Sequence, residues 1–248
     1  MQQTSFITAS NVKVARDTYK MVLVGDTTDI TRPGQFVNIK LEGRYLRRPI
    51  SVCDVNGDEL TLIYKVVGEG TAQMSEYGTG VSLDLLTGLG NGYDTSITGD
   101  TPLLIGGGVG VPPLYLLAKR LIAEGRHVSA ICGFRTAEDA ILCDDLRALG
   151  AELTVATEDG SMGIRGFVTD AMRDRTYTHV CTCGPEPMLK AVYRTMKEGT
   201  DGQFSFEERM GCGFGACMGC SCKTITGYKR ICRDGPILRK SEILWEGK

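Results

Sequence analysis

The 248-residue sequence lacks several features that would assign it to common classes of protein. Its formal net charge is −2 and it has no long run of one charge sign, so nothing indicates a nucleic-acid-binding surface. The first ten residues contain no basic stretch followed by an apolar run, and no apolar run approaches the ~18 residues that span a bilayer. We therefore expect a cytoplasmic protein that binds neither membrane nor nucleic acid.

Histidine is scarce, whereas cysteine is plentiful. Both histidines, His127 and His179, begin segments that read as strands, which favours structural roles over catalysis. The ten cysteines would form a poor disulfide framework in a reducing cytosol, where a metal site is the better interpretation. Cys53, Cys132, Cys143 and Cys181 lie inside predicted strands or a helix, and we interpret them as small buried hydrophobic residues.

The chain divides into three parts of different character, which predicts a multidomain α+β protein. Residues 1–98 contain short segments rich in β-branched and aromatic residues, with an Asn56-Gly57 hairpin signal, and predict an antiparallel β-barrel. In residues 99–200, strand and helix patterns alternate four times, which predicts a parallel sheet with crossover helices. Residues 201–248 form a cysteine-rich tail domain. The helices of the middle part are expected at residues 111–125, 137–150, 166–175 and 185–198.

A glycine-rich segment follows the first strand of the middle domain. Gly107, Gly108 and Gly110 remove side chains where a backbone must approach a ligand, and a helix N-terminus follows. The spacing departs from G-x-G-x-x-G, so a structural turn remains an alternative. A second segment ends the fourth strand, where ligands bind in open parallel sheets. Its residues are Cys183, Gly184, Pro185, Glu186, Pro187 and Met188.

A barrel followed by strands ending in GGGxGxxPL and CGPxPM resembles the ferredoxin reductase family of flavoproteins. The resemblance covers residues 1–200 and implies that both segments bind NAD, with Cys183 near the nicotinamide. It also identifies Arg48, Pro49, Ile50 and Ser51 as a flavin motif, in which the arginine would hold a pyrophosphate. The partner segment would supply Ile63, Tyr64, Lys65, Gly70 and Thr71, with Tyr64 able to pack against the flavin. FAD is preferred over FMN because the resembling family uses it.

The tail carries the most specific pattern in the sequence. Cys212, Cys217 and Cys220 follow the spacing C-x4-C-x2-C, with Cys232 further on, which is typical of a plant-type 2Fe-2S cluster. Intervening glycines would let backbone amides turn toward the sulfurs. Zinc and a disulfide cluster are the alternatives. Cys222 is surplus, and our hypothesis is that it does not bind iron.

The tail resembles that of the electron transfer subunits of dihydroorotate dehydrogenase B, so that the resemblance spans nearly the whole chain. It implies an NAD-linked oxidoreductase subunit in pyrimidine biosynthesis. Electrons would pass from an FMN-containing dihydroorotate dehydrogenase catalytic subunit through the cluster and FAD to NAD+, in a heterotetramer with two chains of each kind.

Other interpretations remain open. One is the NAD(P)H-side subunit of a sulfhydrogenase or a ferredoxin:NADP oxidoreductase. Another is a sensor or scaffold that holds cofactors without turnover. Arg135, which follows the second strand of the middle domain, could meet the 2′-phosphate of NADP, although the resemblance favours NAD.

Overall fold

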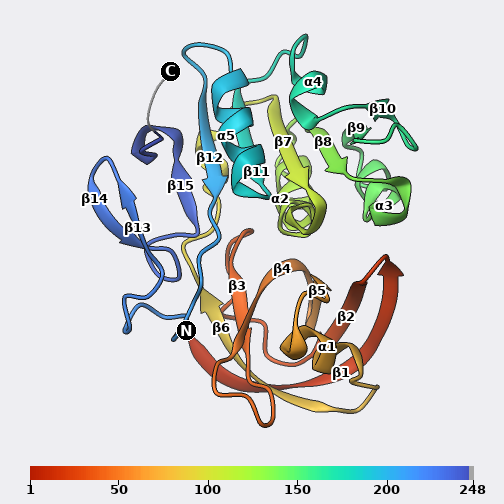
Figure 1. Ribbon diagram of the computed structural model, residues 1–248, viewed down its shortest axis with the longest axis vertical. Coiled ribbons are helices and arrows are strands. Elements are labelled where there is room, and N and C mark those ends of the chain that lie inside the picture. Colours follow the sequence, from red (N-terminus) through yellow and green to blue (C-terminus); the bar gives the residue numbers. More distant parts are fainter. Residues whose placement is uncertain (246–248) are drawn as a thin grey trace.

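The computed structural model describes residues 1–245, and these form a barrel, an α/β domain and a small C-terminal part (Figure 1). In the barrel, six strands of the described chain close in the order β1-β2-β5-β4-β3-β6. A short helix, α1 (Glu69–Ser75), follows β5. The strands are β1 (Gln2–Ala15), β2 (Thr18–Val24), β3 (Phe36–Ile39), β4 (Arg48–Asn56), β5 (Glu59–Lys65) and β6 (Ser82–Leu89).

The α/β domain is built on one sheet with the order β10-β9-β8-β7-β11-β12-β15. Its central strand β7 is buried at every position, as expected of a parallel strand covered on both faces. The strands are β7 (Pro102–Gly107), β8 (Ser129–Phe134), β9 (Glu152–Thr157), β10 (Ile164–Arg165), β11 (His179–Cys183), β12 (Asp201–Ser205) and β15 (Ile237–Arg239). The helices are α2 (Pro112–Ala123), α3 (Cys143–Ala148), α4 (Val168–Met172) and α5 (Glu186–Thr195), with 3-10 turns η1 (Thr95–Ile97), η2 (Gly108–Gly110), η3 (Ala137–Asp139) and η4 (Lys240–Glu242).

Two helices are much shorter than the sequence pattern predicts, whereas α2 and α5 match the expected ranges to within three residues at each end. The expected helix over 137–150 is divided into η3 and α3, because Leu142 between them has a φ of +60°. The expected helix over 166–175 is reduced to α4. Gly166, with a φ of +135°, and the extended Phe167 hold the chain out of helical conformation before it begins. The backbone amide of Phe167 donates to Asp170 Oδ2 at 2.9 Å, which fixes this start.

The C-terminal part contributes to the sheet as well as carrying the cysteines. Its hairpin of β13 (Ser221–Thr224) and β14 (Gly227–Arg230) stands apart from the barrel and the main sheet, whereas β15 pairs antiparallel with β12 (Figure 1). The boundary expected at residue 200 therefore falls between neighbouring strands of one sheet. Residues 246–248 of the expected tail domain lie outside the described residues. The fold class, a barrel with a parallel-sheet domain and a cysteine-rich domain, is confirmed.

Three apolar clusters hold these parts together. One fills the barrel, and a second lies between the main sheet and α2. The third joins the outer face of β3 and β6 to the sheet and to Cys220, Ile231 and Cys232 of the C-terminal part. Strand β3 is buried at all its positions because one face lines the barrel and the other meets this third cluster. Within residues 1–245, no helix is long and apolar enough to cross a membrane.

Candidate cofactor sites

The flavin segment, residues 48–51, opens strand β4 beside helix α1. A Cβ atom added to Gly70 would lie 2.2 Å from Arg48 Nε, so the guanidinium rests on backbone that has no side chain. The Thr71 hydroxyl accepts hydrogen bonds from the amides of Val67 and Gly68, at 2.9 and 3.2 Å, and shapes the turn before the helix. This glycine cradle and its arginine fit a pyrophosphate group, as the sequence predicts.

The three predicted flavin residues on β5 are Ile63, Tyr64 and Lys65, and their side chains lie in different surroundings. The Tyr64 ring is 2 % exposed, stacks on Tyr19 with centroids 5.9 Å apart, and its hydroxyl donates to Asn11 Oδ1 at 3.1 Å. Burial raises the pKa of Tyr64 to about 12. The ring is therefore packed inside the barrel, and only the backbone of Tyr64 could contact a flavin. Ile63 packs into the cluster beneath α2, and Lys65 Nζ lies 3.9 Å from Asp139 Oδ1.

The two predicted nucleotide segments come together in the structure. A Cβ atom at Gly110 would lie 2.3 Å from the carbonyl oxygen of Cys183, and one at Gly107 would lie 2.5 Å from Met188 Sδ. These two glycines are thus required by close packing between the segments. Gly108 differs, because it has a φ of +53° and nothing within 4 Å of an added Cβ. Of the three, Gly108 has the open surroundings expected of a position that faces a ligand.

The end of β11 is anchored to the barrel side of the molecule. The hydroxyl of the buried Tyr93 donates to the carbonyl oxygen of Thr182 at 3.0 Å, one residue before Cys183. Burial raises the pKa of the Cys183 thiol to about 12, so this sulfur stays protonated. On α5, Glu186 pairs with Lys190 at 2.8 Å. Nothing in the sequence pattern near Tyr93 indicated this contact.

A cleft of about 1590 Å³ joins the barrel, the α/β domain and the C-terminal part. Arg48 and Pro49 of the flavin segment line it, and so do Gly184, Pro185 and Glu186 of the nucleotide segment. The structure thus brings the predicted flavin and nicotinamide residues to one opening. Each of these sets comes from a different domain, so neither could form the site alone.

The cysteine-rich loop, residues 211–220, is called the cluster loop here. Backbone amides point at its sulfurs: Ala216 and Cys217 donate to Cys212 Sγ at 3.2 and 3.4 Å, and Gly219 donates to Cys217 Sγ at 3.5 Å. Burial raises the pKa of the Cys212 thiol, but the amide hydrogen bonds outweigh it and lower the pKa to about 6. The loop is built to hold thiolates, which is the form that binds iron.

A second sulfur pair lies deeper. Cys220 and Cys232 are both 1 % exposed, and the Cys232 amide donates to Cys220 Sγ at 3.4 Å. Burial raises the pKa of Cys232 to about 12, and a side-chain hydrogen bond with Cys220 and the charges of Cys220 and Cys212 add to the effect. Cys220 and Cys232 thus form a second sulfur pair in the C-terminal part. That these two pairs together hold one cluster stays a prediction from the C-x4-C-x2-C spacing.

Across the described part of the chain, no group of three or more histidine, cysteine, aspartate and glutamate side chains lies close enough to hold a single metal ion. The preference for a 2Fe-2S cluster over zinc therefore rests on the C-x4-C-x2-C spacing of Cys212, Cys217 and Cys220.

Cys222 lies outside this group. It sits on β13, its Sγ donates to the Lys223 carbonyl at 3.7 Å, and it lines the cleft. Burial raises the pKa of its thiol, and the nearby carboxylates of Glu208 and Glu186 add to the effect. That Cys222 is not a ligand stays a prediction, which substitution of each cysteine tests.

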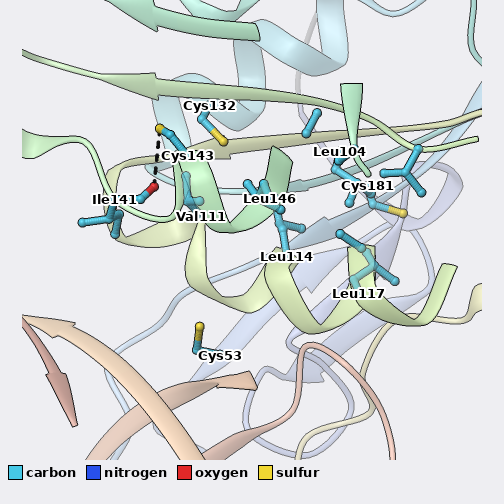
Figure 2. Packing of buried hydrophobic residues seen from close by; sticks show 14 of the residues in the cluster. Cys53, Leu104, Val111, Leu114, Leu117, Cys132, Ile141, Cys143, Leu146 and Cys181 are labelled. Carbon is cyan, nitrogen blue, oxygen red and sulfur yellow. Dashed lines mark hydrogen bonds between the residues drawn. The ribbon is translucent and has the colours of Figure 1, made fainter. Parts of the chain in front are cut away.

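The four cysteines predicted to be structural are buried among apolar side chains (Figure 2). They are Cys53, Cys132, Cys143 and Cys181.

Comparison with known proteins identifies two of these regions. Residues 207–244 match the family described as the iron-sulfur cluster binding domain of dihydroorotate dehydrogenase B, and residues 104–194 match the oxidoreductase NAD-binding domain. These matches confirm the expected cluster-binding and NAD-binding domains and the oxidoreductase class.

Curated relatives match nearly the whole chain. A "dihydroorotate dehydrogenase B (NAD(+)), electron transfer subunit" from Geobacillus sp. strain WCH70 is 40 % identical over 98 % of this chain and 99 % of its own. The protein of the same name from Fusobacterium nucleatum is 43 % identical, with coverages of 94 % and 95 %. Among solved structures, one described as an NADH-dependent reduced ferredoxin-NADP oxidoreductase has a TM-score of 0.88 and 31 % identity, and covers 97 % of this chain and 90 % of its own.

Proposed function

This chain belongs to the family of dihydroorotate dehydrogenase B electron transfer subunits, and we propose that it passes electrons between a catalytic subunit and NAD+. The catalytic subunit would contain FMN and oxidise dihydroorotate in pyrimidine biosynthesis. We further propose a cytoplasmic heterotetramer with two chains of each kind.

The observation that carries this proposal is the convergence of three segments. The flavin and nucleotide segments line one cleft, and the cluster loop contacts the same barrel. FAD, when bound, would exchange one hydride, which carries two electrons, with nicotinamide and single electrons with a 2Fe-2S cluster, so it belongs between them. Arg48 and Gly70 would hold its pyrophosphate, while Cys212, Cys217, Cys220 and Cys232 would hold the cluster.

The remaining residues of the site bind and orient. Gly107 and Gly110 let the nucleotide loop pack against Cys183 and Met188, which fixes the floor on which a nicotinamide would lie. Gly108 leaves open backbone for the pyrophosphate of NAD. Cys183, held protonated by burial, contributes a neutral wall at the end of β11.

The partner would dock where the cluster is closest to the surface. Cys217 is exposed, and Phe214 and Met218 beside it are 42 % and 54 % exposed. Apolar side chains around a redox centre suit a protein partner better than a small substrate.

Anaerobic purification of the tagged protein from its own cells tests this function. We expect dihydroorotate-dependent reduction of NAD+ together with a stoichiometric FMN-containing partner. An eluate with FAD and iron but a different partner and no such activity would leave the cofactors in place and refute the pathway.

The solved ferredoxin-NADP oxidoreductase relative favours a second candidate, in which ferredoxin or another flavoprotein replaces the dihydroorotate-oxidising partner. The same eluate separates the two, because this alternative predicts NAD(P)H-dependent reduction of ferredoxin and no response to dihydroorotate.

Gly70→Ala tests the flavin assignment on its own. The added Cβ would displace the Arg48 guanidinium without straining the backbone, so the FAD dissociation constant should rise about tenfold, the worth of one charge-assisted hydrogen bond. Gly78→Ala is the matched control, because an added Cβ there meets nothing within 4 Å. If Gly70→Ala and Gly78→Ala bound FAD with equal affinity, Arg48 would not be a residue that holds the pyrophosphate.

A further inference from the structure

One buried amide connects the cluster loop to the barrel. Asn38, on β3, is 1 % exposed, and its Nδ2 donates to the carbonyl oxygen of Cys212 at 3.3 Å. Its Oδ1 is also buried and has no hydrogen-bond partner within residues 1–245. A buried amide with one satisfied end and one free end is uncommon, because each unpaired polar atom costs free energy.

Strand register places the same residue beside the flavin segment. Asn38 pairs with Pro49 and Phe36 pairs with Ser51, in the antiparallel ladder of β3 and β4. Directly paired residues project from the same face of a sheet. Phe36 and Asn38 face the cluster domain, as shown by the packing of Phe36 and by the Cys212 contact. Pro49 and Ser51 therefore project from the barrel on this same outer face, one strand away.

We propose that Asn38 is a positioning residue that fixes the cluster loop against the flavin segment and thereby sets the electron path between the two cofactors. This inference rests on the proposed function, since it presumes FAD on residues 48–51 and a cluster on the four cysteines. Asn38 acts through the backbone of Cys212, the first of those ligands, and binds no iron itself.

The surroundings of Asn38 are shaped to hold its amide in one place. Gly213 has a φ of +81°, and a Cβ there would lie 2.3 Å from Asn38 Nδ2, so only glycine admits the amide. Arg47 Nη1 donates to the Asn38 carbonyl oxygen at 3.3 Å and to Asp84 Oδ1 at 2.9 Å. Both the side chain and the backbone of Asn38 are thus fixed from opposite sides.

The test uses the holoprotein with FAD and cluster loaded, and NADH as the reductant. Asn38→Leu removes the donor and the free oxygen with little change of volume, and Asn38→Asp keeps the shape but replaces the donor by an acceptor. Thr8→Val is the matched control, because Thr8 Oγ1 is another buried barrel oxygen without a partner in the described chain, on a strand away from β3. Stopped-flow absorbance separates flavin reduction from cluster reduction, and electron paramagnetic resonance reports the cluster environment.

We expect both Asn38 variants to reduce flavin at the wild-type rate, to reduce the cluster about tenfold more slowly, and to shift the cluster g-values. Thr8→Val should match the wild type in all three. Unchanged cluster reduction and g-values in both Asn38 variants would overturn the proposal and assign Asn38 to packing alone. If Asn38→Leu fails to fold, Asn38→Asp decides by the same readouts. Failure of the proposed function would look different, because the wild-type cluster would then not be reduced by NADH at all.

Discussion

Cysteine has opposite environments in the α/β core and in the cluster loop. Cys132 and Cys181 are 2 % and 0 % exposed on strands of the main sheet, and burial raises the pKa of each thiol far above its ordinary value (Figure 2). In the cluster loop, amide hydrogen bonds overcome burial and lower the pKa of Cys212 to about 6. The same side chain is an apolar filler in one region and a prepared ligand in the other.

The difference comes from the backbone around each sulfur. In a strand, the amides on both sides of the cysteine are used by the ladder, so the thiol meets only side chains. In the cluster loop, Gly213 and Gly215 have φ values of +81° and +91°, which turn neighbouring amides inward toward the sulfurs. The role of a cysteine here is therefore set by which hydrogen-bond donors the local backbone leaves free.

The largest effect should come from removing a ligand. Cys220→Ser should lower the iron content per chain by about tenfold or more and abolish the cluster signal in electron paramagnetic resonance, because four thiolates are needed to close the site. FAD content should remain that of the wild type, since no flavin-segment residue is altered. Iron analysis and flavin absorbance on the same sample provide the measurement.

A Cys220→Ser variant that kept its full complement of iron would contradict the ligand set. The expected set would also need revision if iron were retained in Cys220→Ser and lost when Cys222 is replaced.

Replacing a core cysteine should change stability and spare the cofactors. Cys181→Ser places a hydroxyl where the sulfur is 0 % exposed, and we expect the free energy of unfolding to fall by about 1–3 kcal/mol. Urea denaturation measures this loss, with Cys181→Ala separating the cost of the hydroxyl from that of lost volume. Loss of iron from a folded Cys181→Ser protein would contradict this comparison, because a cysteine of the α/β core would then be needed to bind the cluster.

The cluster-binding tail and the order of domains could be predicted from the sequence because their signals are local. Cys212, Cys217 and Cys220 lie within one short loop, and the strand-helix rhythm of the α/β domain repeats along the chain. The contact between Asn38 and Cys212 joins residues 174 positions apart, and β15 returns to pair with β12. Such contacts depend on how the domains dock, and no short pattern records them.

The role suggested for the Tyr64 side chain shows the same limit at a single residue. Its place on β5 was predicted, but the side on which its ring lies depends on Tyr19 and Asn11 of other strands. The helix over 137–150 was predicted too long because one leucine, Leu142, adopts a conformation that its sequence neighbourhood does not signal.

The stability of the α/β core should also depend on pH, because the core contains a buried histidine, His179. His179 shares β11 with Cys181, and both lie beside the Gln203 amide, with His179 Nε2 3.3 Å from Gln203 Nε2. Burial lowers the pKa of His179, against the opposing charges of Asp201 and Asp94 and in the same direction as Arg239.

A histidine with a lowered folded-state pKa binds its proton more tightly when unfolded. Its contribution to stability is therefore complete above the unfolded pKa of ~6.5 and is lost as pH falls below it, with a slope of at most ~1.4 kcal/mol per pH unit. His179→Gln should flatten the fall in unfolding free energy between about pH 7 and 5, as followed by urea titrations. An equal slope in both proteins would mean that other groups govern the acid response.

The smallest effect is expected for the cysteine that belongs to neither region. Cys222 lines the cleft, yet it lies two residues from the proposed ligand Cys220. Cys222→Ser should keep the wild-type iron content and change the free energy of unfolding by no more than about 0.5 kcal/mol, because the half-buried sulfur makes one weak contact with a carbonyl. Iron analysis of Cys222→Ser and Cys220→Ser side by side is the decisive measurement, because the spacing of the cysteines in the sequence hardly distinguishes Cys222 from Cys220. If the iron content fell as far as in Cys220→Ser, Cys222 would be needed for the cluster even though it lies on β13, outside the cluster loop. The cluster loop and Cys232 alone would then not define the ligands.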